Sequence, residues 1–357
     1  MESISLAADS LGPDLVPNEE LADCAATVLG RDGKAILSYG SAAGYTPLRE
    51  LIGEWFGVHP ARVVLTNGSL DGLALLAQRV APSRNVVAEY PIYDRAEKVF
   101  LVAEASLLGA PMDEEGMVVE ELHNMLSQYA TPAIVYTIPS FHNPTGWTMS
   151  LARRRRTVEL VEGQGMVQLQ DMLLFEDDAY ALTRFEGERE PALFDLSRQR
   201  SLYSSSFSTT IAPGLRVGWL VLPEAIANEL DEAASGTYIT PSLLSQATVH
   251  EFIGRGSFEP HVARLRAALK LRRDAMLTAL EQHMPDGKWS RPEGGFFIWL
   301  ELPGLPDGRA VLERAQGVTA VPGTAFGAMS SFLRLSYSFA PPDEIDAGIQ
   351  RLAAALR

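Results

Sequence analysis

The stretch RVVLTNGSLDGLALLAQR, from Arg62 to Arg79, decides the fold. Its first five residues form a mostly apolar run that predicts a short buried strand. Asn67, Gly68 and Ser69 interrupt this strand, and residues 70–79 carry apolar side chains at helical spacing. A buried strand followed at once by a helix is typical of a parallel sheet that helices cover on both faces.

The same alternation continues outward along the chain. Further short strands are predicted at 85–89, 133–137, 173–176, 201–205 and 217–222, and a helix at 151–162. After about residue 223 longer helical patterns dominate, at 224–234, 243–252, 258–283 and 343–356, with strands at 296–300 and 333–337. We therefore predict an α/β protein with a mostly parallel sheet, helices on both of its faces, and a smaller α+β domain at the C-terminal end.

The length of 357 residues leaves room for about two domains. We place a large domain at residues 39–240 and a small C-terminal domain at 241–357. Residues 1–38 show no periodic strand and helix pattern. We expect this N-terminal segment to pack near the functional site or across a subunit interface.

The charge balance is acidic, with 30 Lys and Arg against 45 Asp and Glu and a net charge of −15. Such a surface repels phosphates, so binding to nucleic acid or to an anionic membrane is not expected. No apolar run is long enough to span a membrane, and the N-terminus does not have the pattern of a signal peptide. We expect a cytoplasmic protein with a small-molecule substrate.

Metal binding is also not expected from the sequence. Cys24 is the only cysteine, so neither an internal disulfide nor a cysteine-ligated metal cluster is possible. The six histidines are scattered, without pairs at helical spacing. The run of four arginines, 153–156, lies at the start of a predicted helix, and at this net charge we interpret it as a solvated face.

Polar and aromatic residues follow each predicted strand, where open α/β sheets bind ligands. The segment after the first strand, 66–72, begins a helix and offers free backbone N–H groups to a phosphate. The other segments are Glu89-Tyr90-Pro91-Ile92-Tyr93, Ser140-Phe141-His142-Asn143-Pro144-Thr145-Gly146, Glu176-Asp177-Asp178-Ala179-Tyr180, and the eleven residues from Ser206 to Arg216.

The order and spacing of these motifs resemble the fold-type I pyridoxal-phosphate enzymes of the class I/II aminotransferase family. The segments N-P-T-G (143–146), E-D-D-x-Y (176–180) and S-F-S-x-T-x-A-P-G-L-R (206–216) carry the resemblance, which extends from about Tyr39 to the C-terminus. The chain looks most similar to the branch with aminoadipate and kynurenine transaminases. The resemblance implies the three-layer fold of this family, a homodimer with shared active sites, and pyridoxal or pyridoxamine phosphate as coenzyme.

The resemblance also implies a role for each matching residue. Asp177 contacts the pyridine nitrogen of the coenzyme, Asn143 and Tyr180 bind its phenolate oxygen, and Tyr93 stacks on the ring. Arg334 binds the α-carboxylate of the substrate, with Asn143 beside it. The phosphate-binding residues are Gly68, Ser69, Leu70, Ser206, Ser208, Arg216 and, from the neighbouring subunit, Tyr39.

One position departs from the family, because Thr209 stands where the Schiff-base lysine belongs. The four lysines of the chain, Lys34, Lys98, Lys270 and Lys288, lie outside the matched motifs. A threonine hydroxyl neither forms an exchangeable imine nor takes a proton readily at neutral pH. The coenzyme is therefore expected to be held noncovalently, and ordinary transamination to be slow.

Three explanations of Thr209 remain open at this point. The residue is a substitution that traps a substrate imine, or the enzyme acts on an external aldimine without a lysine, or the protein is a noncatalytic homologue. The second explanation includes elimination, decarboxylation or oxidative deamination in natural-product biosynthesis. A coenzyme-responsive transcription regulator is disfavoured, because no helix-turn-helix segment is present and the charge has the wrong sign. The other coenzyme-binding residues are intact, which favours retained binding of the coenzyme. The expected chemistry is at the α-carbon and α-amino group of an amino acid or amino-acid conjugate.

Overall fold

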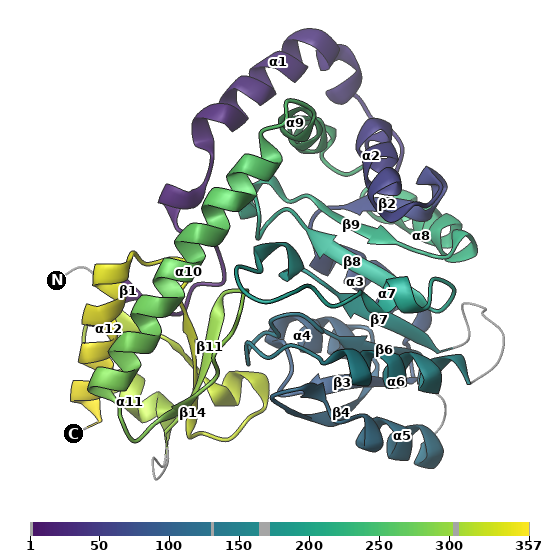
Figure 1. Cartoon of the computed structure of the whole chain (residues 1–357). Coiled ribbons are helices and arrows are strands. Elements are labelled where there is room, and N and C mark those ends of the chain that lie inside the picture. The colour runs from purple at the N-terminus through teal and green to yellow at the C-terminus, as the bar shows by residue number, and fades with distance from the viewer. Residues whose placement is uncertain (1–2, 130–131, 164–171, 303–306, 357) are drawn as a thin grey trace.

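A large mixed sheet forms the centre of the computed structural model, which describes residues 3–129, 132–163, 172–302 and 307–356 (Figure 1). The order of its eight strands is β2-β9-β8-β7-β6-β3-β4-β5. These strands are β2 (Val63–Thr66), β3 (Asn85–Tyr90), β4 (Ser106–Asp113), β5 (Gly116–Met117), β6 (Ile134–Thr137), β7 (Leu173–Asp177), β8 (Ser201–Ser206) and β9 (Gly218–Val221). The five strands β4, β3, β6, β7 and β8 pair in parallel, whereas β9 is antiparallel to both of its neighbours. The predicted mostly parallel sheet is thus confirmed.

Helices cover both faces of this sheet because side chains alternate along each strand. Ile134 and Tyr136 of β6 pack with α3 and α4 in one apolar cluster, whereas Val135 packs in another cluster with α5, α6 and α7. The helices of this part are α2 (Thr46–Phe56), α3 (Ser69–Val80), α4 (Asp94–Val102), α5 (Val119–Gln128), α6 (Leu151–Glu162), α7 (Leu193–Leu196) and α8 (Glu224–Thr237). The result is three layers, helix, sheet and helix.

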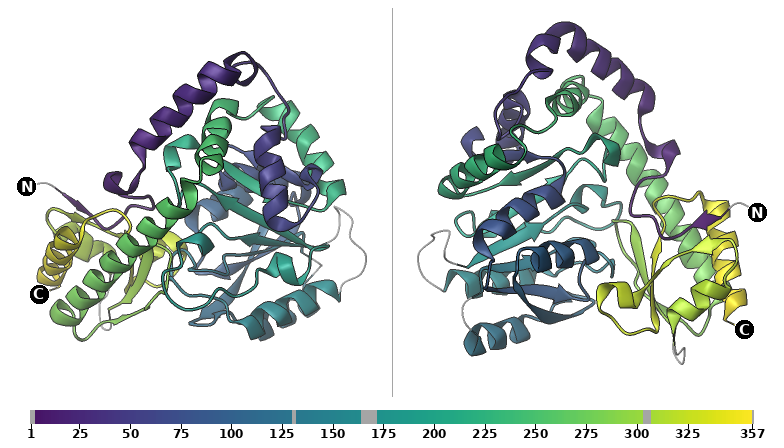
Figure 2. Two further views of the ribbon diagram at one scale, coloured as in Figure 1. Left: turned by 45° about the horizontal axis from the view of Figure 1, so that its top comes forward. Right: turned by 180° about the vertical axis from the view of Figure 1, so that it is seen from behind.

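A second, smaller sheet is built from the C-terminal part of the chain. It is antiparallel in the order β10 (Lys288–Trp289), β11 (Phe297–Glu301), β14 (Phe332–Ser336), β13 (Val321–Pro322). Its helices are α10 (Phe258–His283), α11 (Gly308–Arg314) and α12 (Pro342–Ala355), while α9 (Leu243–Gly254) lies beside the large sheet. The long helix α10 extends from the neighbourhood of α9 to the small sheet, as Figures 1 and 2 show.

The N-terminal segment is more ordered than the sequence pattern predicted. It contains β1 (Ile4–Ser5), which pairs in parallel with β12 (Val318–Thr319), and the helix α1 (Asn18–Ile36). Leu21, Cys24 and Val28 form the buried face of α1, which packs against α9. Small and polar residues between these apolar positions weakened the periodic signal. The helix at residues 18–36 was therefore not predicted from the sequence pattern.

Five single turns of 3-10 helix complete the described elements: η1 (Pro13–Leu15), η2 (Pro60–Arg62), η3 (Ala181–Thr183), η4 (Pro213–Leu215) and η5 (Gly323–Phe326). The turns η3 and η4 follow β7 and β8, so they form part of the edge where the strand ends gather. Across the described ranges, no helix has the length and apolar character needed to cross a membrane.

Candidate active site

A cavity of about 330 Å³ lies at the carboxyl ends of the parallel strands. Its wall includes Ser69 after β2, Tyr93 after β3, Ile138 after β6, Asp177 at the end of β7 and Ser206 at the end of β8. The remaining lining residues are Asp9, Ser10, Leu70, Arg95, Ala179, Tyr180, Ser208, Thr209, Pro213 and Arg216. Four of the five segments quoted from the sequence thus contribute to one wall, whereas the segment 140–146 with Asn143 does not line this cavity.

Asp177 places an unpartnered carboxylate oxygen beside this space. Its Oδ2 accepts a hydrogen bond of 2.8 Å from the Tyr136 hydroxyl, whereas its buried Oδ1 has no hydrogen-bond partner. Burial raises the pKa of Asp177 to about 7, against a smaller lowering by the Tyr136 hydrogen bond. A protonated ring nitrogen would satisfy Oδ1 and return the carboxyl group to its charged form. The buried Oδ1 of Asp177, which has no hydrogen-bond partner, therefore fits a bound pyridinium ring.

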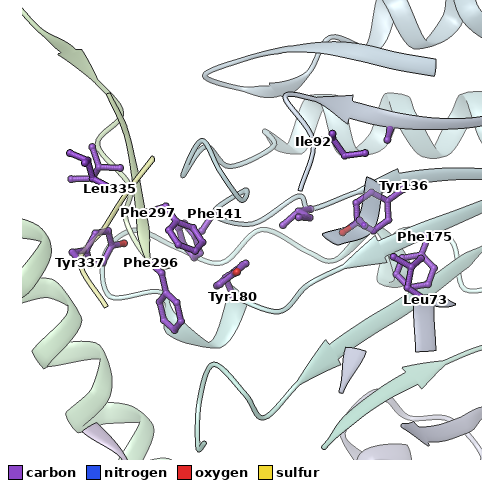
Figure 3. Packing of buried hydrophobic residues seen from close by; sticks show 14 of the residues in the cluster. Leu73, Ile92, Tyr136, Phe141, Phe175, Tyr180, Phe296, Phe297, Leu335 and Tyr337 are labelled. Carbon is purple, nitrogen blue, oxygen red and sulfur yellow. The ribbon is translucent and has the colours of Figure 1, made fainter. Parts of the chain in front are cut away.

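Tyr180 lines the cavity and is connected to Asn143 and Arg334, which are not among the lining residues. The Asn143 amide donates to the Tyr180 hydroxyl at 3.4 Å, and its oxygen accepts from the Arg334 guanidinium at 2.9 Å. The ring of Tyr180 packs edge-on against Phe296 and Phe297, whose arrangement Figure 3 shows. Asn143 is therefore fixed in one orientation by two different partners.

Arg334 is buried without an ion-pair partner among the described residues. Its guanidinium donates to the Ala7 carbonyl at 2.9 Å and lies over the rings of Phe297 and Phe326. Its Nε has no hydrogen-bond partner. Burial lowers the pKa of Arg334, because a charged guanidinium is poorly solvated there. A carboxylate ligand would supply a countercharge to the guanidinium and a hydrogen-bond acceptor to its Nε, which suits the role that the resemblance implies.

The start of α3 and the loop after β8 form a cradle for an anion. Gly68 precedes α3 with a φ of 95°, and a Cβ at this position would collide with the guanidinium of Arg216. Arg216 donates to the carbonyl of Asn67 at 2.9 Å and lines the cavity together with Ser69 and Leu70. The hydroxyls of Ser206 and Ser208 lie 2.8 Å apart on the same wall. Helix N–H groups, two hydroxyls and one guanidinium converge here, as a phosphate requires.

Thr209 lines the cavity, but its hydroxyl is turned to the backbone. Its Oγ1 donates to the Ala179 carbonyl at 2.5 Å, so its single proton is already used. The four lysines lie elsewhere and none lines this cavity. Lys98 pairs with Asp94, Lys270 pairs with Glu186, and Lys34 and Lys288 are exposed. No amine of a described side chain therefore takes the place of the missing lysine.

The structure separates Tyr39 from the other predicted residues. Its side chain is 80% exposed and belongs to a surface hollow with Leu37, Pro241 and Leu243. Within one chain it does not reach the cavity, so its action on a neighbouring subunit stays a prediction. Tyr93 does line the cavity, and burial raises the pKa of its hydroxyl.

Sequence reasoning missed the contribution of the first residues. Asp9 and Ser10 line the cavity, and Asp9 faces Arg95 with 3.6 Å between oxygen and nitrogen. The expectation that the N-terminal segment packs near the site is met here, but no motif singled out Asp9 or Arg95. A short polar segment carries no periodic signal. Its position depends on the pairing of β1 with β12 and on hydrogen bonds from Arg334, Ser336 and Ser338 to the carbonyls of Ala7, Leu6 and Ser10.

The arginine run contains one residue that the sequence misassigned. Arg154 is buried, and its guanidinium donates to the carbonyls of Met149 and Pro139 at 3.0 and 2.8 Å. It also lies 3.7 Å from Glu176. The prediction of a solvated face was wrong for Arg154, because only the tertiary packing turns one of four arginines inward. This residue ties the Asn143 loop to the rest of the sheet.

Comparisons with known proteins agree with this geometry. The family model "Aminotransferase class I and II" matches residues 16–352. The 2-aminoadipate transaminase of Thermus thermophilus is 36% identical over 99% of this chain and 90% of its own length. Crystal structures of the α-aminoadipate aminotransferase of Thermus thermophilus, complexed with a phosphopyridoxyl-leucine, and of the kynurenine aminotransferase of Pyrococcus horikoshii, with pyridoxamine phosphate, superimpose with a TM-score of 0.93 each. Their identities are 34% and 35%, over 99% and 100% of this chain and 92% and 91% of theirs.

Proposed function

The chain belongs to the class I and II aminotransferases, and from this premise we propose that it holds its coenzyme without a covalent bond and acts at the α-carbon of an amino acid or amino-acid conjugate. The cofactor of the family is pyridoxal or pyridoxamine phosphate. When bound, it supplies an electron-withdrawing ring that weakens the bonds to the α-carbon. The single observation that carries the proposal is Thr209, with its hydroxyl committed to a backbone carbonyl, in a cavity that otherwise fits the coenzyme.

Each end of the coenzyme has a matching group in this proposal. Asp177 holds the ring nitrogen protonated, because its free Oδ1 accepts that N–H in a buried site. Arg216, Ser206, Ser208 and the start of α3 hold the phosphate. Asn143 and Tyr180 donate hydrogen bonds to the phenolate oxygen in this proposal, and Tyr93 stacks on the ring face.

Arg334 then selects the substrate class. It is buried, lacks a carboxylate partner among the described residues and lies against Asn143. A substrate α-carboxylate would be bound by its free N–H groups. We propose Arg334 and Asn143 as the substrate-binding residues, with the rest of the substrate directed toward Asp9 and Arg95.

The reaction that follows depends on how the missing amine is replaced. Transamination is the chemistry named for the similar proteins reported above, and elimination, decarboxylation or oxidative deamination are alternatives in which water or another group acts as the base in place of the lysine. A noncatalytic binding protein is the second candidate function, and the blocked hydroxyl of Thr209 favours it. The buried Arg334 and the free oxygen of Asp177 favour the enzyme.

We further propose a homodimer in which Tyr39 reaches the phosphate of the partner. Tyr39 shares a surface hollow with Leu37, Pro241 and Leu244, and the side chain of Leu37 is 68% exposed. A second copy of the chain would cover them.

Titration of the purified protein with pyridoxal phosphate and pyridoxamine phosphate tests the proposal. Visible and near-ultraviolet absorbance should change to saturation with either form, and thermal stability should rise. Adding an amino acid should then alter the spectrum of the pyridoxal form more than adding the matching decarboxylated amine does. The variant Arg334→Gln should lose this preference while it still binds the coenzyme. Absence of any spectral and thermal response to both forms would sink the proposal.

A further inference from the structure

A second cavity, of about 410 Å³, lies outside the active site, between the segment that follows Tyr180 and the helix α10. We call it the seam pocket, because residues 181–189 and the small-sheet part of the chain meet there. Its wall consists of Ala181, Leu182, Arg184, Phe185, Gly187, Arg189, Arg266, Ala267 and Lys270. Four of these nine side chains are cationic, although the protein as a whole carries a net charge of −15.

The positive charges of the seam pocket are unevenly paired. Arg184 has Glu293 at 2.8 Å, and Lys270 has Glu186 and, at 3.7 Å, Asp274. Arg189 reaches only the buried Asp178, at 3.7 Å, and its side chain stays half exposed. Within the described ranges, Arg266 has no carboxylate in ion-pair contact, and its Nε donates to the Leu182 carbonyl at 2.8 Å. One guanidinium is therefore left without a countercharge.

The two arginines also act on each other. Burial lowers the pKa of Arg266, and the positive charge of Arg189 lowers it further. Two guanidinium groups that repel each other beside an open cavity favour an anion between them. Arginine forks bind phosphate and carboxylate oxygens with two parallel hydrogen bonds each.

We propose that the seam pocket binds a multivalent oxyanion, a phosphate monoester or a polycarboxylate, through Arg189, Arg266 and Lys270. Arg189 comes from the segment after β7, and the other two come from α10, so the ligand bridges two parts of the chain. This site is separate from the phosphate cradle at Arg216.

Occupancy of the seam pocket would reach the active site through η3. That turn begins directly after Tyr180, and the Thr183 hydroxyl accepts from the Gly295 N–H at 3.0 Å. Phe185 and Glu186 donate their backbone N–H groups to the Glu293 carbonyl at 2.9 and 3.1 Å. An anion held between this segment and α10 would stabilise the same arrangement. If the anion and the coenzyme both bind this arrangement more tightly, thermodynamic linkage requires that each strengthens the binding of the other.

Calorimetric titration with sodium phosphate and, separately, with citrate tests the site. Chloride keeps the ionic strength constant, because salt screens such contacts. The protein is first saturated with pyridoxamine phosphate, which fills the cradle at Arg216 and whose absorbance is followed throughout. We expect saturable binding of at least one anion, and the stronger of the two identifies the ligand class. Absence of saturable binding by both anions would overturn the proposal.

The variant Arg266→Gln should weaken anion binding about tenfold, the typical effect of losing one charged hydrogen-bonding group. Arg266→Lys should retain part of the affinity, because the charge remains. Arg264→Gln is the matched control, since Arg264 lies on the same helix, is 63% exposed and faces Glu20 at 3.7 Å. Equal affinities of Arg266→Gln and Arg264→Gln would contradict the assignment.

Two further variants separate this inference from the proposed function. Arg189→Gln changes a half-exposed side chain and serves if Arg266→Gln does not fold. Arg216→Gln disables the coenzyme cradle, and anion binding that survives in this variant belongs to the seam pocket. If the coenzyme fails to bind while this anion binding persists, the proposed function fails and the seam pocket stands. Loss of anion binding in Arg216→Gln, with its retention in Arg189→Gln and Arg266→Gln, would assign the anion to the cradle.

Discussion

Thr209 is the residue on which the chemistry depends. Its hydroxyl donates to Ala179 at 2.5 Å, on the wall of the cavity that holds Asp177 and Arg216. Thr209 thus lies where a side chain could contact the coenzyme, but it offers a hydroxyl in place of an amine. A neutral hydroxyl without a general base to take its proton is a weak nucleophile and a weak base.

Replacing Thr209 with lysine should restore a covalent link to the coenzyme. The variant Thr209→Lys, mixed with pyridoxal phosphate and reduced with borohydride, should gain the mass of one coenzyme per chain. Neither the unaltered protein nor Thr209→Ser should gain it at that site, and peptide mapping locates the label. Labelling of the unaltered protein at Lys34, Lys98, Lys270 or Lys288 with full occupancy would contradict the noncovalent interpretation.

Asp177 should make stability depend on pH in the absence of coenzyme. Its pKa rises from an ordinary value of 3.8 to about 7 on folding, because burial disfavours the charged carboxylate. The folded protein therefore binds this proton more tightly, so the contribution to the free energy of unfolding is largest below pH 4 and is lost as pH rises to 7. The loss is at most about 1.4 kcal/mol per pH unit.

Urea unfolding at pH 5 and at pH 7.5 measures this contribution. Asp177→Asn should have a smaller difference between the two pH values than the unaltered protein. Asp286→Asn, at an exposed position, serves as the control and should leave the difference unchanged. Glu89 is also buried with a pKa raised to about 7, so part of the dependence persists in Asp177→Asn.

At the scale of elements, the junction between β2 and α3 decides the shape of the proposed phosphate cradle. Gly68 has a positive φ and is in close contact with Arg216, and Gly218 of β9 approaches Gly68 and Ser69 from the neighbouring strand. A side chain at Gly68 would displace the guanidinium from the cradle. The glycine is needed here for both backbone conformation and space.

Gly68→Ala should lower coenzyme affinity about tenfold or more, because Arg216 supplies a charge-assisted pair to the phosphate. Fluorescence or absorbance titration with pyridoxal phosphate measures the change. Gly30→Ala is the control, since Gly30 lies within α1 with open space around it, and there alanine should stabilise the helix by up to about 1 kcal/mol. Equal coenzyme affinity in both variants would show that the cradle does not need Gly68.

At the scale of the whole molecule, the proposed homodimer depends on one surface hollow. A hollow of about 680 Å³ lies between residues 36–39 and 240–244, with Leu37 68% exposed and Tyr39 80% exposed. Contiguous exposed apolar side chains of this kind mark protein contacts. A second copy would bury them and bring Tyr39 toward the partner's phosphate cradle.

Leu37→Glu should convert a dimer into a monomer and weaken coenzyme binding at the same time. Analytical ultracentrifugation gives the mass, and absorbance titration gives the affinity. Leu271→Glu is the control, because Leu271 is 65% exposed on α10 and lies outside this hollow. A monomeric unaltered protein with full coenzyme affinity would show that the hollow serves another purpose.

The sequence was sufficient for several elements with a clear helical spacing or a short strand pattern between turn residues. The helices at 151–162 and 258–283 were predicted with the bounds that the structure has, and β2, β6 and β8 lie within a residue of the predicted strands. The strand β4 was not predicted, since Ala110 is its only buried residue and its pattern resembles a loop. The helix α1 was not predicted either, because its apolar face is narrow and interrupted.

The local motifs by themselves predicted that no lysine lines the cavity and that five residues do: Ser69, Tyr93, Asp177, Ser206 and Arg216. Such motifs are read within a few residues, and the parallel sheet then brings the strand ends together. Only the tertiary structure decided that Asp9 and Arg95 join the wall and that Arg154 points inward. It also decided that Arg266 lines one cavity with Arg189 and has no ion-pair partner among the residues described. These facts depend on contacts between residues far apart in the chain, and no local pattern of charge or hydrophobicity encodes such contacts.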